Sequence, residues 1–261
     1  MKKSGRAIQT LVVALVTACG LPQASASVTY SVDVNTSDME PFNTTIDGDT
    51  TPGALTGGIH LTLVSSTDPS LPGNYVTVCS DIEGALNIGQ SYEYNTPVTP
   101  FSGQSGLNPM WGDLSSDGSA AKAIQNAAYL FYNFNNLTGG SGNLTSDGLT
   151  GTAQEMATLQ LAVWMALYNT VANGSVTGTR FSVTGADTTA IADAASWVLG
   201  LNGSYDYTGY LLYPTDGSAP GAPQELLIAA PVPEAPTVIA GALLLLPLGA
   251  SAFRVLRRRH A

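Results

Sequence analysis

Apolar residues follow two different spacings along the chain. Before and after the middle of the chain, β-branched and other apolar residues alternate with polar ones in short runs bounded by Gly, Pro and Asp, which predicts strands. The predicted strands cover residues 28–35, 58–65, 74–79, 204–213 and 224–230. Between them, apolar residues recur at helical spacing, which predicts helices over residues 119–134, 152–169 and 188–199. This order of elements predicts an α+β fold, an antiparallel β sandwich or barrel with a helical insert.

The first 26 residues have the three parts of a secretory signal peptide. A basic start precedes an apolar run over residues 7–18 that is too short to span a bilayer, and the small residues Ala24-Ser25-Ala26 predict cleavage after Ala26. An alternative remains open, because residues 16–19 resemble a lipoprotein signal that would keep Cys19 as a lipidated N-terminus. In both cases Cys19 cannot form a disulfide with the only other cysteine, Cys79.

The other end of the chain predicts a membrane anchor. Residues 237–253 carry no charge and are long enough to cross a bilayer, and arginines follow at Arg254 and Arg257–Arg259. We therefore predict a transmembrane helix over residues 237–256. A cluster of arginines directly after a span stays on the cytoplasmic side, so the body of the protein is expected outside the cytoplasm.

This tail, residues 231–261, resembles the PEP-CTERM sorting signal in its Pro233-Glu234 pair, its apolar span and its final run Arg257-Arg258-Arg259. It departs from the usual pattern at Ala235, since the second proline comes one place late, at Pro236. The resemblance implies a bacterial cell-surface protein that an exosortase-type protease sorts, in an envelope that produces exopolysaccharide or biofilm matrix. A plain C-terminal anchor is the alternative.

The part between the signal and the tail, residues 27–230, has the length of one domain. It contains two basic residues, Lys122 and Arg180, against eighteen acidic ones, so its formal charge is −16. Such a charge excludes nucleic acid and anionic lipid as electrostatic partners.

Two isolated polar groups stand in apolar surroundings. Cys79 lies in a predicted strand, and Gln160 shares one face of the second predicted helix with Trp164, because residues four positions apart lie on the same side. A thiolate can attack a carboxamide carbonyl and expel ammonia, which leaves an internal thioester. Such a bond needs cover from water, and Trp164 with Tyr129, Tyr132 and Tyr168 would supply it.

The same residues resemble the Cys–Gln thioester domains (TQxA-like) of bacterial surface proteins. The resemblance covers roughly residues 57–230 and rests on three ordered motifs: Cys79-Ser80-Asp81, Ala127-Ala128-Tyr129-Leu130 and Gln160-Leu161-Ala162-Val163-Trp164. It implies a Cys79–Gln160 thioester that captures an amine or hydroxyl on a partner surface or matrix polymer, with Asp81 orienting the cysteine segment. The chain departs from the better-known members before the glutamine, where Leu159 replaces a threonine.

Other interpretations stay open. Cys79 can be a buried free thiol and Gln160 a satisfied core amide, in a structural matrix or envelope protein without covalent chemistry. A cysteine hydrolase would need His60 as its base. We expect no enzyme activity and no cofactor. We also expect no metal, because Asp47-Gly48-Asp49 and Ser146-Asp147-Gly148 are more typical of turns than of calcium ligands.

Overall fold

The computed structural model describes residues 26–32, 39–66, 71–82, 84, 86–96, 99–100, 119–172, 175–177, 180–185, 187–201, 207, 210–215 and 223–229. The signal peptide expected over residues 1–26, apart from Ala26, and the sorting tail expected over 231–261 lie outside these residues. Within the described part of the chain, no helix has both the length and the apolar character needed to cross a bilayer.

Fourteen strands and four helices make up the described chain. The first strands are β1 (Ala26–Val32), β2 (Met39–Ile46), β3 (Asp49–Gly57), β4 (Ile59–Ser66), β5 (Asn74–Thr77), β6 (Ser91–Thr96) and β7 (Thr99–Pro100). The middle contains α3 (Ser119–Tyr132), α4 (Phe134–Leu137), β8 (Asn143–Thr145), β9 (Gly148–Thr150), α5 (Ala153–Tyr168), β10 (Thr170–Ala172), β11 (Ser175–Thr177), β12 (Phe181–Gly185) and α6 (Thr188–Leu199). The chain returns to strands at β13 (Tyr210–Leu212) and β14 (Leu226–Ile228).

These elements confirm the predicted α+β class, but the strands do not close into a barrel. The largest sheet has the order β6-β1-β4-β5-β9-β8, and the other strands form the sets β12-β2-β3, β14-β13-β7 and β10-β11. One contact in the largest sheet is parallel, between Val76 of β5 and Gly148 of β9. A Cβ atom at Gly148 would lie 2.1 Å from the carbonyl oxygen of Val76, so only glycine permits this approach.

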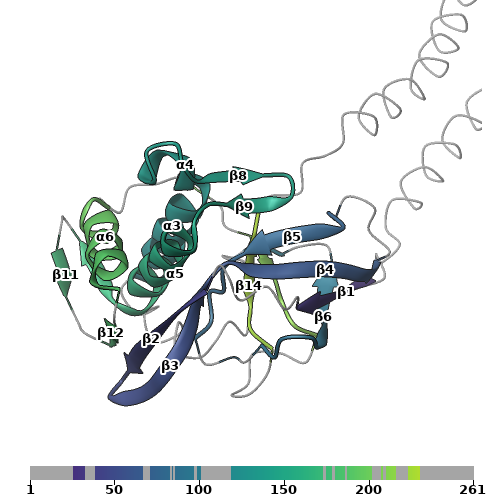
Figure 1. Cartoon of the computed structure of the whole chain (residues 1–261), viewed down its shortest axis with the longest axis horizontal. Coiled ribbons are helices and arrows are strands. Elements are labelled where there is room, and N and C mark those ends of the chain that lie inside the picture. Colours follow the sequence, from purple (N-terminus) through teal and green to yellow (C-terminus); the bar gives the residue numbers. More distant parts are fainter. Residues whose placement is uncertain are drawn as a thin grey trace, which may run out of the picture.

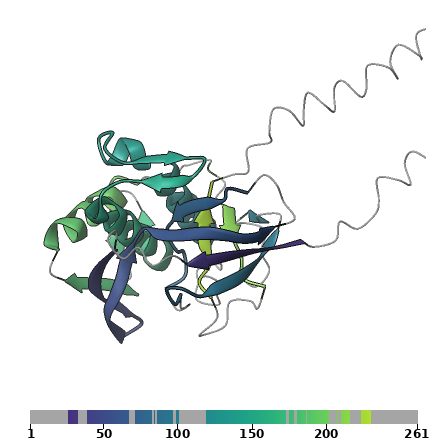
Figure 2. The same cartoon turned by 45° about the vertical axis from the view of Figure 1, so that its right-hand side comes forward.

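The helices gather on one side of the molecule and the largest sheet lies on the other, as the two views in Figures 1 and 2 agree. α5 is the central helix, because its residues are buried on every face, including Thr158 and Ala162 on the side opposite Gln160. α6 instead buries one stripe, Ala190, Ala194 and Val198, at the spacing of an amphipathic helix. Both helices match their predicted ranges within one residue at each end.

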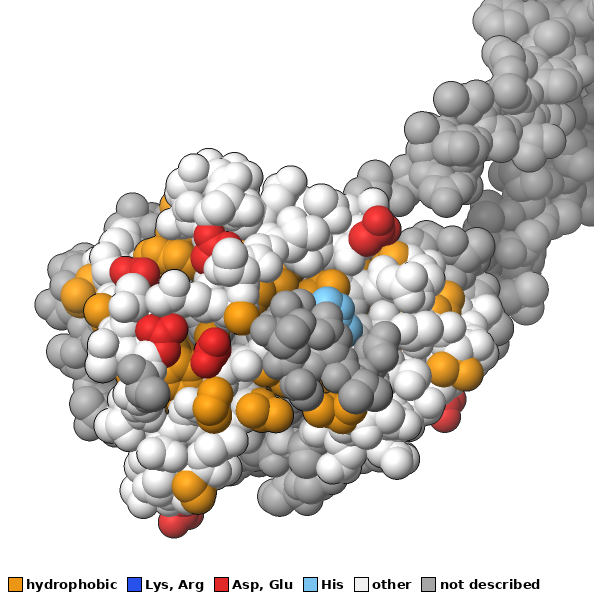
Figure 3. Space-filling model, viewed as in Figure 1, with side chains coloured by type: hydrophobic (Ala, Val, Ile, Leu, Met, Phe, Trp, Pro, Cys, Tyr) orange, Lys and Arg blue, Asp and Glu red, His pale blue; other side chains and the backbone are white. Residues whose placement is uncertain are grey.

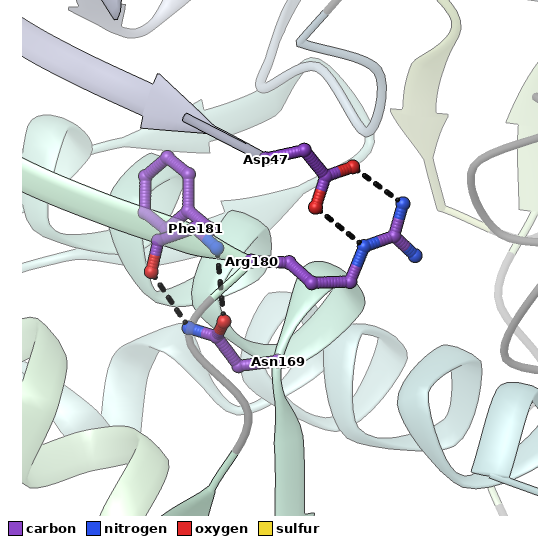
Figure 4. A network of polar contacts seen from close by, with 4 residues as sticks. All are labelled: Asp47, Asn169, Arg180 and Phe181. Carbon is purple, nitrogen blue, oxygen red and sulfur yellow. Dashed lines mark hydrogen bonds and ion pairs between the residues drawn. The ribbon is translucent and has the colours of Figure 1, made fainter. Parts of the chain in front are cut away.

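The hairpin of β2 and β3 was not predicted. Its turn is Asp47-Gly48, whose φ angles of 50° and 96° both lie in the left-handed region that a tight hairpin turn requires. The Arg180 side chain, just before β12, donates two hydrogen bonds to the Asp47 carboxylate, at 3.0 and 2.9 Å (Figure 4). Asn169, at the end of α5, donates to the carbonyl of Phe181 and accepts from its N–H. The hairpin is thereby tied through β12 to the end of α5.

Several predicted strands are shorter in the structure. Of the strand expected over 204–213, residues 204–206, 208 and 209 lie outside the described residues, and β13 covers Tyr210–Leu212. The strand expected over 224–230 is β14, Leu226–Ile228. The strand expected over 74–79 ends as β5 at Thr77. Ser146 and Asp147 form the turn between β8 and β9, as Asp47 and Gly48 do between β2 and β3, which confirms both as turns.

The start of α5 provides a test of the local structure. The Thr152 hydroxyl accepts from the N–H of Glu155, and the Glu155 carboxylate accepts from the N–H of Thr152, which confirms the capping box. Thr152→Ala should lower the free energy of unfolding by about 1 kcal/mol, because an N–H at the helix start loses its acceptor. Thr152→Ser keeps the hydroxyl and should stay close to the wild type in urea denaturation. Equal losses in both variants would contradict a role for the cap.

Candidate functional site

The side chain of Gln160 lies directly against Cys79. The N–H of Cys79 donates to Oε1 of Gln160 at 2.8 Å, and Nε2 of Gln160 donates to the carbonyl oxygen of Cys79 at 2.6 Å. These two bonds fix the orientation of the carboxamide, since a flipped amide would face donor with donor and acceptor with acceptor. The Cys79 thiol also donates to Oε1, with Sγ and Oε1 3.3 Å apart. The sulfur therefore lies next to the carbonyl group that it would have to attack.

The C-terminal strand holds the Cys79 backbone in this position. Cys79 forms an isolated antiparallel bridge with Leu226, the first residue of β14. On either side of it, the N–H of Ser80 donates to Glu225 at 2.9 Å, and the N–H of Leu227 donates to Val78 at 3.0 Å. The hydroxyl of Thr77 reinforces the pairing by donating to the carbonyl of Leu227. A segment almost 150 positions further along the chain thus places the cysteine.

α5 supplies the other half of the pair. Gln160 and Trp164 are one helical turn apart on the same face, and both line the pocket that Cys79 also lines. Their exposed fractions are 1% and 2%, and that of Cys79 is 3%. Trp164 therefore lies buried at the pocket together with the pair, and its ring packs edge-on against Phe181.

The pocket above the pair has a volume of about 450 Å³. Its floor contains Cys79, Gln160 and Trp164. The β2–β3 hairpin contributes Met39, Thr44, Thr51, Ala54, Leu55 and Gly57 to the lining, and the chain after the cysteine contributes Ile82, Gly84, Leu86, Asn87 and Ile88. This size is typical of pockets that bind small molecules or the end of a larger one. The pair is thus buried in the fold but borders a space that a second molecule can enter.

The surroundings of Cys79 disfavour a thiolate. Burial raises the pKa of Cys79 well above its ordinary value, and the carboxylate of Asp81 raises it further. The N–H of Cys79 and the side chain of Trp164 act in the opposite direction. Asp81, which the sequence analysis expected to orient the cysteine segment, is itself buried two positions after Cys79. The carboxylate of Asp81 lies near enough to the sulfur to affect its protonation, and the indole of Trp164 favours the charged form.

Two further buried groups near Cys79 were missed by the sequence analysis. Both carboxyl oxygens of Glu225 and the hydroxyl of Tyr94 have no hydrogen-bond partner among the described residues, and neither side chain is exposed. Burial, and then the charge of Asp81, raise the pKa of Glu225 to about 8. Burial raises the pKa of Tyr94, and Tyr92 and then Cys79 add smaller contributions in the same direction. The signal for Glu225 was a single acid in the apolar run Leu226-Leu227-Ile228, and nothing in the sequence indicated Tyr94.

Two residues considered from the sequence lie elsewhere. Tyr129 of α3 packs edge-to-face on Tyr207, with ring centroids 5.6 Å apart, and it does not line the pocket. His60 follows Ile59 in β4, and successive strand residues point to opposite faces. Because Ile59 lines the pocket, His60 points to the other side of the sheet. The structure therefore does not bring to the Cys79 pocket the base that a cysteine hydrolase would need.

Charge on the described surface is mainly acidic, and in the face shown in Figure 3 the charged groups are Asp and Glu side chains scattered among neutral ones. The part of the chain that the structure describes contains no group of three or more His, Cys, Asp or Glu side chains that could hold a metal ion. No protein-family model matches the chain, and no curated protein or solved structure matches it either.

The buried carboxyl of Glu225 predicts a pH dependence of stability. In the folded chain Glu225 keeps its proton up to about pH 8, whereas an unfolded chain loses it near pH 4.5, the ordinary pKa of the group. The free energy of unfolding should therefore fall between these two pH values, by a few kcal/mol, since each unit of pKa shift is about 1.4 kcal/mol. Glu225→Gln, which cannot ionise, should remove most of this loss.

Urea denaturation at about pH 5 and about pH 8.5 measures the effect. The exposed Glu93 of β6 provides the matched control, because Glu93→Gln removes a carboxylate that is already in water. The Glu93→Gln variant should lose as much stability on raising the pH as the wild type does. If Glu225→Gln loses that amount too, the ionisation of Glu225 is not the cause.

Proposed function

We propose that this chain is an exported, envelope-anchored protein in which Cys79 and Gln160 form an internal thioester. The thioester captures an amine or a hydroxyl on a partner surface or matrix polymer, so that the chain becomes covalently attached. The observation that carries the proposal is the contact between Sγ of Cys79 and Oε1 of Gln160, 3.3 Å, at the floor of a pocket. The other parts of the proposal rest on the sequence. They are export by the signal over 1–26, a membrane helix over 237–256 and sorting by an exosortase-type protease.

The geometry suits the formation of the bond. When the sulfur attacks the side-chain carbon of Gln160, negative charge develops on Oε1, and the N–H of Cys79 already donates to that oxygen. A backbone donor aimed at a developing oxyanion is among the strongest catalytic contributions that a protein makes. The C–N bond then breaks, the thiol proton is transferred to the nitrogen, and ammonia leaves. A finished thioester also has to be kept away from water, and the burial of the pair supports this.

The mass of the intact protein tests the proposal. The processed chain, purified in mild detergent, should be lighter than its sequence mass by one ammonia. Cys79→Ala and the nearly isosteric Gln160→Glu should both abolish this loss, because each removes one reacting group. Gln154→Ala is the matched control, since Gln154 lies on the same helix but is exposed and bonded to Asp187. It should retain the lighter mass.

The opposite result is equally clear. A wild-type chain with its full sequence mass and a titratable thiol at Cys79 would refute the thioester. The contact would then be structural, with the Gln160 amide anchoring the Cys79 segment through its two backbone hydrogen bonds. The remaining interpretation would be a structural matrix or envelope protein without covalent chemistry.

A further inference from the structure

The mouth of the pocket above Cys79 is apolar and partly exposed. Leu55 of β3 is 51% exposed, and Ile88, which also lines the pocket, is 37% exposed. Five large hydrophobic side chains are exposed in the described chain, and two of them line this one pocket. Single exposed apolar residues need no explanation, but two of them in a largely apolar pocket are typical of a binding site.

The apolar surface continues from the mouth down to the reacting pair. Aliphatic side chains from several elements are among the lining residues, namely Val32, Met39, Ile59 and Leu86. The polar groups in the lining are neutral: Thr44, Thr51, Asn87 and Gln224. Among the described residues that line the pocket, none is an acid, a lysine, an arginine or a histidine. The buried acids Asp81 and Glu225 are not among the lining residues, although a Cβ atom at the lining residue Gly84 would lie 2.9 Å from a carboxylate oxygen of Asp81.

We propose that this pocket selects a primary amine on an uncharged, apolar stem as the group that the thioester captures. The proposal rests on the proposed function and adds the chemical class of the acceptor. It predicts discrimination against two other classes, namely amines that carry a second charge and hydroxyl compounds.

The physical reason is the cost of charge in such surroundings. At neutral pH roughly one alkylamine molecule in a thousand is the free base, since its pKa is close to that of lysine. An apolar pocket disfavours the ammonium form and so favours the reactive free amine. A second ammonium on the same molecule would be buried without a partner among the described lining residues, at a cost of several kcal/mol. A hydroxyl is a weak nucleophile unless a base takes its proton, and the described lining supplies none.

The capture step is balanced without any further reagent. The amine nitrogen attacks the side-chain carbon of Gln160, and the bond from that carbon to Sγ of Cys79 breaks. The proton lost by the nitrogen ends on the sulfur. The products are a secondary amide at position 160 and a free thiol at Cys79.

The test uses the full chain in mild detergent, with the ammonia loss first verified by intact mass. Four probes are compared: methylamine, butylamine, 1,4-diaminobutane and butanol. Butylamine should form an adduct at Gln160 at least roughly ten-fold faster than diaminobutane at equal concentrations of free amine, because the second charge is excluded. Butanol should form no adduct over the same time. Methylamine, which is small, reports whether the thioester is reachable at all.

Variants at the mouth sharpen the test. Leu55→Asp places a carboxylate beside the opening and should raise the rate with diaminobutane relative to butylamine, whereas Leu55→Asn, of the same size without charge, should not.

The outcomes separate the two proposals. If methylamine reacts and diaminobutane reacts as fast as butylamine or faster, the selection for an apolar stem is wrong while the thioester stands. If butanol reacts at a rate like that of butylamine, the preference for an amine is wrong. If the chain has its full mass and methylamine forms no adduct, the proposed function fails and this inference fails with it.

Discussion

The fold around the site depends on one buried interaction, the carboxamide of Gln160 bonded to both backbone polar groups of Cys79. A buried amide or backbone group that loses its partner costs about 1–3 kcal/mol, so separating the two residues would leave several such groups unpaired. The central helix and the cysteine segment are therefore locked at a single relative position. That position also puts the sulfur beside the carbonyl carbon. The same geometry fits a structural role, in which Gln160 anchors the cysteine segment, and a chemical role, in which the two residues form a thioester. The intact mass of the protein distinguishes between these two roles.

Segments from distant parts of the chain cooperate to keep this position. β14 pairs with the cysteine segment at Leu226, and the β2–β3 hairpin lines the pocket together with Ile82, Gly84, Leu86, Asn87 and Ile88. The ion pair between Arg180 and Asp47 connects the turn of the hairpin to the residue before β12. Exposed ion pairs contribute little to stability, so the pairing of β2 with β12 has to hold the hairpin.

The sequence predicted the helices well and the strands only in part, for identifiable reasons. α5 has a capping box at Thr152 and an apolar surface on all sides, and both are local signals. The pairing of Cys79 with Gln160 was predicted because each is an isolated polar group in apolar surroundings. The β2–β3 hairpin is rich in threonine and contains Pro41 and Pro52, which argue against strands. A bulge between Phe42 and Thr44 absorbs the irregularity. Tyr129 was expected to cover the pair because it is one of several aromatic residues in this part of the chain, but such a composition does not show which element packs against a given ring.

The acidic surroundings of Cys79 have a consequence for the direction of the proposed capture. Burial and Asp81 raise the pKa of Cys79, so the sulfur released when the thioester opens becomes a neutral thiol rather than a thiolate. A thiol is a far weaker nucleophile, and the new amide is harder to attack than the thioester was. Both effects suppress the reverse of the proposed capture, which would make the proposed attachment permanent. The same raised pKa opposes the formation of the thioester, because the attack on the carboxamide requires the thiolate form of Cys79. The N–H of Cys79 lowers that barrier, because it favours the thiolate and also donates to the oxygen that becomes negative.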